Sequence, residues 1–174
     1  SHLEGVRLDA IVPSVPAVAY RHRGDFHVVS SGAEVRIGIY QEESHRVINL
    51  DVCLLFDASF NRVFGALRAA LKDAPGAHGL ERLSLARSEA EETYALLFLV
   101  KAHTGTQDAA RLAAIGLDAG CAGVRVCPAS DLDVVLALAG HPWIEYGLAR
   151  PGGEEDGLSM RSDVRSFTQA HYAM

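Results

Sequence analysis

The sequence predicts one α+β domain, in which an antiparallel or mixed β-sheet packs with two main helices, and three observations support this prediction. The length of 174 residues is typical of a single domain. An apolar fraction of 49% and a charged fraction of 22% indicate a globular chain rather than a disordered one. Short segments with the two-residue period of strands alternate with two segments that have helical spacing.

The first fifty residues have the pattern of an antiparallel meander. An extended lead-in over 3–18 contains two prolines and no clear period. Turn signals at Ser31-Gly32 and at 42–44 then separate three segments with strand character. We therefore expect strands over 19–30, 35–40 and 46–50.

The rest of the chain repeats the order helix, strand, strand. Asp57 is the expected cap of a helix over 58–73, and Thr106 is the expected cap of a second helix over 107–118. The expected strands lie around Leu83 and Leu85, over 94–100, and near 123–127, 133–138 and 143–149. This order is compatible with a duplicated α-β-β unit. A loop or linker is expected over 150–157, followed by an extended stretch over 158–167.

Charge and hydropathy restrict the class of protein. The net charge of −6 counts against binding nucleic acid by net attraction, although a local basic face is compatible with it. No run of about 18 apolar residues and no signal-peptide pattern is present. We expect a cytoplasmic protein with no membrane partner.

No complete catalytic motif is found in the sequence. Glycine-rich phosphate loops and metalloprotease or serine-hydrolase signatures are missing. The three cysteines, Cys53, Cys121 and Cys127, do not form a disulfide framework, and the last two are expected to be buried strand residues. A cysteine nucleophile paired with His103 or His141 is a less favoured alternative.

Cationic and aromatic residues gather in the first fifty positions. The candidate RNA-contacting residues are Tyr20, Arg21, Arg23, His45 and Arg46. Antiparallel pairing would bring them onto one face, where arginine and histidine beside an aromatic ring suit phosphate contact and base stacking. An ordinary solvated strand face is the alternative, because three nearby glutamates offset the positive charge.

Four short motifs follow one another along the chain. They are Tyr20-Arg21-His22-Arg23, then Gly38-Ile39-Tyr40, then Ser44-His45-Arg46 leading to Cys53, and finally Arg165-Ser166-Phe167-Thr168-Gln169. Their series resembles the RNA (uracil-5-)-methyltransferase family, whose members use S-adenosyl-L-methionine (SAM) to form 5-methyluridine in transfer or ribosomal RNA. Two positions depart from the family pattern, with His22 in place of the usual asparagine and Ile39 in place of the usual phenylalanine.

The resemblance implies that this chain is part of a longer enzyme. Residues 1–157 would be its central RNA-recognition domain, and 158–174 the start of a C-terminal SAM-dependent methyltransferase domain. The nucleophilic cysteine and the general-base glutamate of the family lie in that C-terminal domain, so this part alone is expected to be inactive. Its expected partners are RNA and the remaining domains of its own chain, not DNA.

Two residues have roles that the resemblance alone implies. Gln169 corresponds to a family glutamine at the pocket for SAM and the target uracil. Cys53 corresponds to the last of four ligands of a four-iron four-sulfur cluster in the longer protein. The three upstream cysteine ligands are absent here, and a cluster normally needs four thiolates, so no cluster is expected in this chain.

A second hypothesis comes from a different class of protein. The acidic net charge and the two helix-strand-strand units are also compatible with a regulatory or oligomerisation module. Such an α+β module would bind a small ligand or a partner protein.

Overall fold

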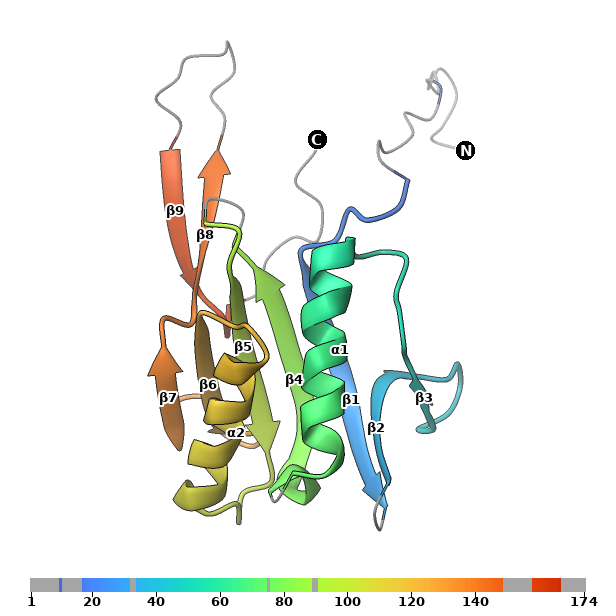
Figure 1. Cartoon of the computed structure of the whole chain (residues 1–174), viewed down its shortest axis with the longest axis vertical. Coiled ribbons are helices and arrows are strands. Elements are labelled where there is room, and N and C mark those ends of the chain that lie inside the picture. Colours follow the sequence, from blue (N-terminus) through green and yellow to red (C-terminus); the bar gives the residue numbers. More distant parts are fainter. Residues whose placement is uncertain are drawn as a thin grey trace, which may run out of the picture.

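The computed structural model describes residues 10, 17–31, 34–74, 76–88, 91–148 and 158–166. They form a seven-stranded mixed sheet, with both α-helices on one of its faces, and a separate two-stranded sheet (Figure 1). This arrangement confirms the predicted α+β class. Among the described residues, none of the helices has the length and apolar character needed to cross a membrane.

The large sheet has the strand order β3-β2-β1-β4-β5-β6-β7. Its strands are β1 (Arg23–Ser31), β2 (Glu34–Tyr40), β3 (Val47–Asn49), β4 (Leu80–Arg87), β5 (Tyr94–Val100), β6 (Gly123–Pro128) and β7 (Ala137–Gly140). The first three strands pair antiparallel in chain order, which confirms the predicted meander. On its other side β1 pairs antiparallel with β4, and this pairing joins the meander to the second half of the sheet. The β5–β6 pair is parallel.

The two helices are α1 (Ala58–Lys72) and α2 (Thr106–Asp118). Asp57 caps α1 as predicted, because its carboxylate accepts a hydrogen bond from the Phe60 backbone N–H at 2.7 Å. The predicted cap of α2 is wrong: Thr106 is already the first helical residue, and extended Gly105 precedes it without a side-chain cap bond. The element order α1-β4-β5 followed by α2-β6-β7 is the predicted one.

Each face of the large sheet carries a separate hydrophobic core. The larger core lies between the helices and the sheet and includes Phe60, Leu67 and Phe98. On the opposite face, a hairpin of β8 (Trp143–Leu148) and β9 (Leu158–Asp163) contributes buried Ile144 to a smaller core. The sheet residues of this second core come from β4, β5 and β6 and from none of the described strands β1 to β3. The hairpin therefore covers part of that face.

Some predicted boundaries are wrong, and each has a local cause. The strand expected near 133–138 is β7 at Ala137–Gly140, because Asp131 accepts a hydrogen bond from the Asp133 N–H at 3.0 Å and closes a turn. The first strand begins at Arg23 rather than at 19, where Ala19 has a left-handed φ of 58°. The strand over 46–50 is one residue shorter at each end, and the helix over 58–73 ends one residue early, at Lys72.

Three further predictions fall wholly or partly on residues that the structure does not describe. The loop expected over 150–157 lies outside the described residues, as does most of the lead-in over 3–18. The extended stretch expected over 158–167 is strand β9 as far as Asp163, and residues 164–166 form a turn.

Candidate nucleic-acid interface

A tight turn between β2 and β3 holds His45 and Arg46 outward. The Gln41 N–H donates to the Arg46 carbonyl at 2.8 Å, and the Ser44 hydroxyl accepts from the Arg46 N–H at 3.2 Å. Glu43 adopts a left-handed φ of 55° at the tip. The side chains of His45 and Arg46 are both exposed. The short serine-containing turn therefore presents two basic side chains at the edge of the sheet.

Three rings from β1, β2 and this turn lie against one another. The ring of His27 stacks on that of Tyr40, with centroids 3.7 Å apart and an interplanar angle of 22°. His45 meets Tyr40 edge-on at 5.5 Å. Tyr40 is 43% exposed although it is a large aromatic residue, so one side of the stack is open to a ligand. We call His27, Tyr40 and His45 the aromatic cluster.

The other predicted contact residues, Tyr20, Arg21 and Arg23, lie before and at the start of β1. Tyr20 and Arg21 precede the strand, where the N–H groups of Ala19 and Arg21 donate to the carbonyls of Leu54 and Leu55. Arg21 is exposed and Tyr20 is half-buried. Four residues of strand, about 13 Å, separate Arg23 from His27. The five predicted residues thus form two groups, one where the chain enters β1 and one in the turn after β2.

Arg23 is already engaged within the chain. Its guanidinium donates to the Ser166 carbonyl at 2.6 Å and lies 3.7 Å from the Asp25 carboxylate, and its side chain is only 13% exposed. These contacts fix the segment after β9 against the start of β1. Gln169 and Phe167 lie just beyond that segment, outside the described residues.

Cys53 lies beside the chain that enters β1. Its backbone is held by Asn61 of α1, which accepts from the Cys53 N–H at 2.9 Å and donates to the Cys53 carbonyl at 3.1 Å. The next two carbonyls along the chain, those of Leu54 and Leu55, are the ones bonded to the segment 19–21. Cys53 is a half-buried free thiol.

An iron–sulfur cluster does not fit the cysteines of this chain. Cys53 and Cys121 are on the side of the larger core and Cys127 is in the smaller core on the other face of the sheet, so the three thiols do not share one face. Burial raises the pKa of the Cys121 thiol to about 12, which disfavours the thiolate that a metal requires. Within the described ranges, no three His, Cys, Asp or Glu side chains group as a metal site. The predicted burial of these two cysteines is confirmed.

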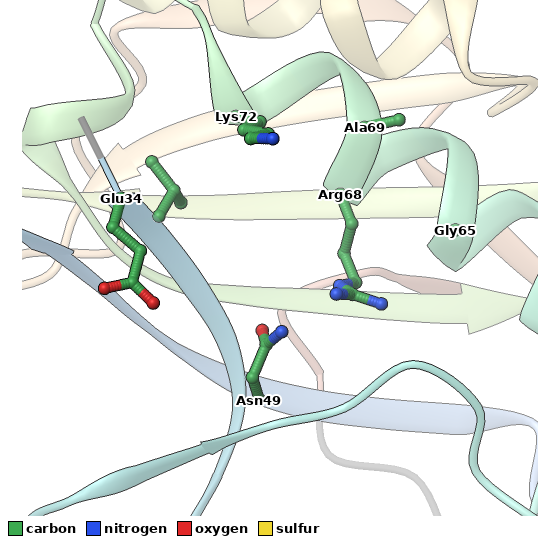
Figure 2. Close-up of a pocket in the computed structure, with 7 residues that line it drawn as sticks. Glu34, Asn49, Gly65, Arg68, Ala69 and Lys72 are labelled. Atoms are coloured by element: carbon green, nitrogen blue, oxygen red, sulfur yellow. The ribbon is translucent and has the colours of Figure 1, made fainter.

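A groove of about 460 Å³ lies between α1 and strands β2 and β3. Figure 2 shows Arg68 reaching from α1 toward Asn49, with Lys72 further along the helix and Glu34 on the facing strand. Arg68 is paired with Asp51 at 2.7 Å. The residues that line this groove include no aromatic ring. The groove therefore presents charged groups to a ligand but no ring on which a base could stack.

The structure adds one cation that the sequence pattern does not reveal. Arg82 of β4 stands directly opposite His27 in the β1–β4 register, and it is exposed. The two residues are 55 positions apart, so only the pairing of β1 with β4 brings them together. The face that carries the aromatic cluster is therefore more cationic than the first fifty residues indicate.

The fold and these side chains together place the chain in the class of α+β modules. One face of its sheet is partly open and carries stacked aromatic rings beside cationic residues. Sheet faces of this kind bind single-stranded nucleic acid in several domain families. No family model matches the chain. An uncharacterised RNA methyltransferase of Clostridium acetobutylicum is 28% identical over 71 residues, which are 41% of this chain and 15% of that protein.

A solved structure is similar over almost the whole chain. It is the tRNA (uracil-54, C5)-methyltransferase of Pyrococcus abyssi in complex with S-adenosyl-L-homocysteine. The TM-score is 0.62 at 15% identity, and the match covers 92% of this chain but 39% of that one. The first comparison shows a sequence similarity to an RNA methyltransferase, and the second shows a shared fold. The chain spans well under half the length of either relative.

Proposed function

We propose that this chain is the central RNA-recognition part of a longer, SAM-dependent enzyme that methylates the uracil 5-position of transfer or ribosomal RNA. The observation that carries the proposal is the fold likeness, over 92% of the chain, to a part of a tRNA uracil methyltransferase. The sequence similarity to an RNA methyltransferase agrees with it. In this proposal the protein acts in the cytoplasm, on RNA rather than DNA or membranes.

The positions of the motif residues also support the proposal. Cys53 lies beside the chain entering β1, which is where the resemblance places upstream cluster ligands in the longer protein. The Ser44-His45-Arg46 turn presents its basic side chains outward, as an RNA-contacting turn requires. We keep Tyr20, Arg21, His45 and Arg46 as proposed RNA contacts. Arg23 would not contact RNA directly, and it would instead hold the segment at Ser166 against the start of β1.

The proposed division of labour assigns no chemical step to this chain. Residues 1–157 would bind and orient RNA, and residues 158–174 would lead into the methyltransferase domain, where Gln169 would line the pocket for SAM and uracil. The bound SAM would supply the methyl group. The target base must leave its stack to reach such a pocket, and a stacking surface beside it would help to hold the neighbouring strand open. The chain alone is expected to bind RNA without methylating it.

A double substitution tests the proposed contacts. We expect Arg21→Ala with Arg46→Ala to weaken binding of a uridine-containing stem–loop RNA about tenfold and to lower the salt slope of the affinity by about 2, because each cation contacts a phosphate. Fluorescence anisotropy titrations at several salt concentrations measure both quantities. The matched control is Arg111→Ala on α2, where the guanidinium pairs with Asp108 and no RNA contact is proposed.

Two results would count against the proposal. Equal affinities for the wild type and the double variant, without salt dependence, would remove the named contacts. A stable dimer with no response to RNA would favour the regulatory or oligomerisation module, and sedimentation would detect it.

A further inference from the structure

Among the residues that the structure describes, none forms a second layer over β1, β2 and the start of β4 on the sheet face opposite the helices. Within the described ranges, the sheet residues that share a hydrophobic core with the β8–β9 hairpin come from β4, β5 and β6. Further along, Val29 of β1 is 38% exposed and Tyr40 of β2 is 43% exposed. Apolar and aromatic side chains at this level of exposure on a strand face are available to a ligand.

A hollow of about 540 Å³ lies in this region of the sheet. We call it the β1–β4 hollow, and its polar and aromatic lining consists of His27, Ser30, Tyr40, His78, Glu81, Arg82 and Lys101. Its volume lies within the range of about 300–1,000 Å³ that is usual for small-molecule sites, so a nucleotide fits. The lining comes from five separate segments: strands β1, β2 and β4, the short 3₁₀ helix Ala77–Gly79 that carries His78, and the loop after β5 that carries Lys101.

The lining of the hollow is cationic although the whole chain is acidic. Arg82 and Lys101 are permanent cations, and Glu81 is the one carboxylate among the lining residues. The Ser30 hydroxyl fixes the His78 ring through a hydrogen bond of 2.5 Å to Nδ1. The Lys101 backbone is fixed by its N–H, which donates to the Gly79 carbonyl at 2.8 Å. These cationic side chains attract an anion locally, although the net charge of the whole chain is −6.

His27 faces charged groups from every neighbouring element. Burial lowers the pKa of His27, and Arg82 on β4 and His45 in the turn lower it further, while Asp25 on β1 acts in the opposite direction. The Asp25 carboxylate is itself occupied by the Ser84 hydroxyl. The free protein therefore carries a neutral His27 at neutral pH, and a bound anion would favour its protonation.

We propose that the β1–β4 hollow binds one nucleotide of a single-stranded RNA segment, with the base on the Tyr40–His27 stack and the phosphate at Arg82 and Lys101. The inference rests on the proposed function and adds a site to it. Aromatic rings beside cations are the usual means of holding unpaired bases, since every base has a face that can stack. The stacked pair is open on the Tyr40 side, and the cations border the same hollow.

Three variants of the full chain test the site. Tyr40→Ala removes the stacking ring, Tyr40→Phe keeps it, and Arg82→Ala with Lys101→Ala removes the two cations. The probe is a fluorescently labelled uridine-rich single strand of about eight nucleotides, a length within the range of single-strand binding sites. Uridine monophosphate is a second probe that separates a strand site from a free-nucleotide site.

We expect Tyr40→Ala to weaken strand binding about tenfold or more, with Tyr40→Phe close to the wild type. The double cation variant should lower the salt slope by about 2. Affinity of the wild type should increase as the pH falls from neutral to below the ordinary histidine range, because the pKa of the free His27 is lowered and its protonated ring attracts phosphate. His27→Gln should remove most of this increase. Arg111→Ala on α2 is the control and should change nothing.

The outcomes separate the site from the proposed function. If the wild type binds the strand and the hollow variants bind equally well, the site is overturned while the proposed function stands. If the wild type binds no RNA at all, both fail. If uridine monophosphate binds as tightly as the strand, the hollow is a nucleotide site and the strand assignment is overturned. If Tyr40→Phe loses as much affinity as Tyr40→Ala, stacking is not the cause.

Discussion

Replacing Gly38 with alanine is expected to lower the free energy of unfolding by about 3 kcal/mol and RNA affinity about tenfold. A methyl group at this position would lie 1.8 Å from the Ile48 carbonyl oxygen, closer than two atoms can approach. Strand β3 pairs with β2 through three residue pairs, one of which is Gly38–Asn49, so β3 cannot absorb the clash without moving. Its movement would displace the turn that carries His45 and Arg46.

Gly65→Ala is the matched control for this prediction. Gly65 lies in the interior of α1, and an added methyl group there meets nothing within 4 Å. Alanine should therefore stabilise the helix by about 0.5–1 kcal/mol and leave RNA binding unchanged. Urea denaturation and RNA titration of both variants measure the two effects. Because Gly65 lines the groove of Figure 2, a loss of RNA affinity in this variant would place the contact there instead.

Removing Arg125 is expected to cost about 3 kcal/mol of stability, since it leaves one oxygen of a buried carboxylate without its cationic donor. Arg125 on β6 donates to the Asp163 carboxylate of β9 at 2.8 Å, and the two side chains are 9% and 13% exposed. The other Asp163 oxygen accepts from the backbone and side chain of Arg165. This pair joins the large sheet to the β8–β9 hairpin and to the segment that Arg23 holds.

Arg161 provides the comparison within the same hairpin. It pairs with Glu145, but its side chain is 62% exposed, so Arg161→Ala should cost only about 0.5 kcal/mol or less. Arg125→Ala and Arg161→Ala are compared by urea denaturation, with Asp163→Asn completing a double-mutant cycle for the buried pair. Equal losses in the two arginine variants would contradict the view that Arg125 and Asp163 join the hairpin to the sheet.

Local patterns were enough to predict most of the fold. The buried stripe of α1 and its Asp57 cap follow from spacing within one helix, and β5 is a continuous apolar run. The prediction fails where a short-range hydrogen bond overrides the apolar pattern. Val134 and Val135 resemble a strand, but the Asp131 turn precedes them and β7 starts at Ala137.

The candidate site was harder to predict because distant segments build it. The turn with His45 and Arg46 is local and was found, whereas Arg82 reaches His27 only through the β1–β4 pairing. Arg23 was predicted as an RNA contact from its neighbours in sequence. Its contact with the Ser166 carbonyl, 143 positions later in the chain, has no local signal.

Ultraviolet cross-linking of a uridine-containing stem–loop RNA to the full chain, followed by mapping of the linked peptides by mass spectrometry, tests the central claim most directly. The claim is that RNA lies on the sheet face and turn formed by β1, β2 and β3. We expect cross-links in the peptides that contain Tyr40 and His45. Cross-links confined to the helices α1 and α2, or none at all, would contradict it.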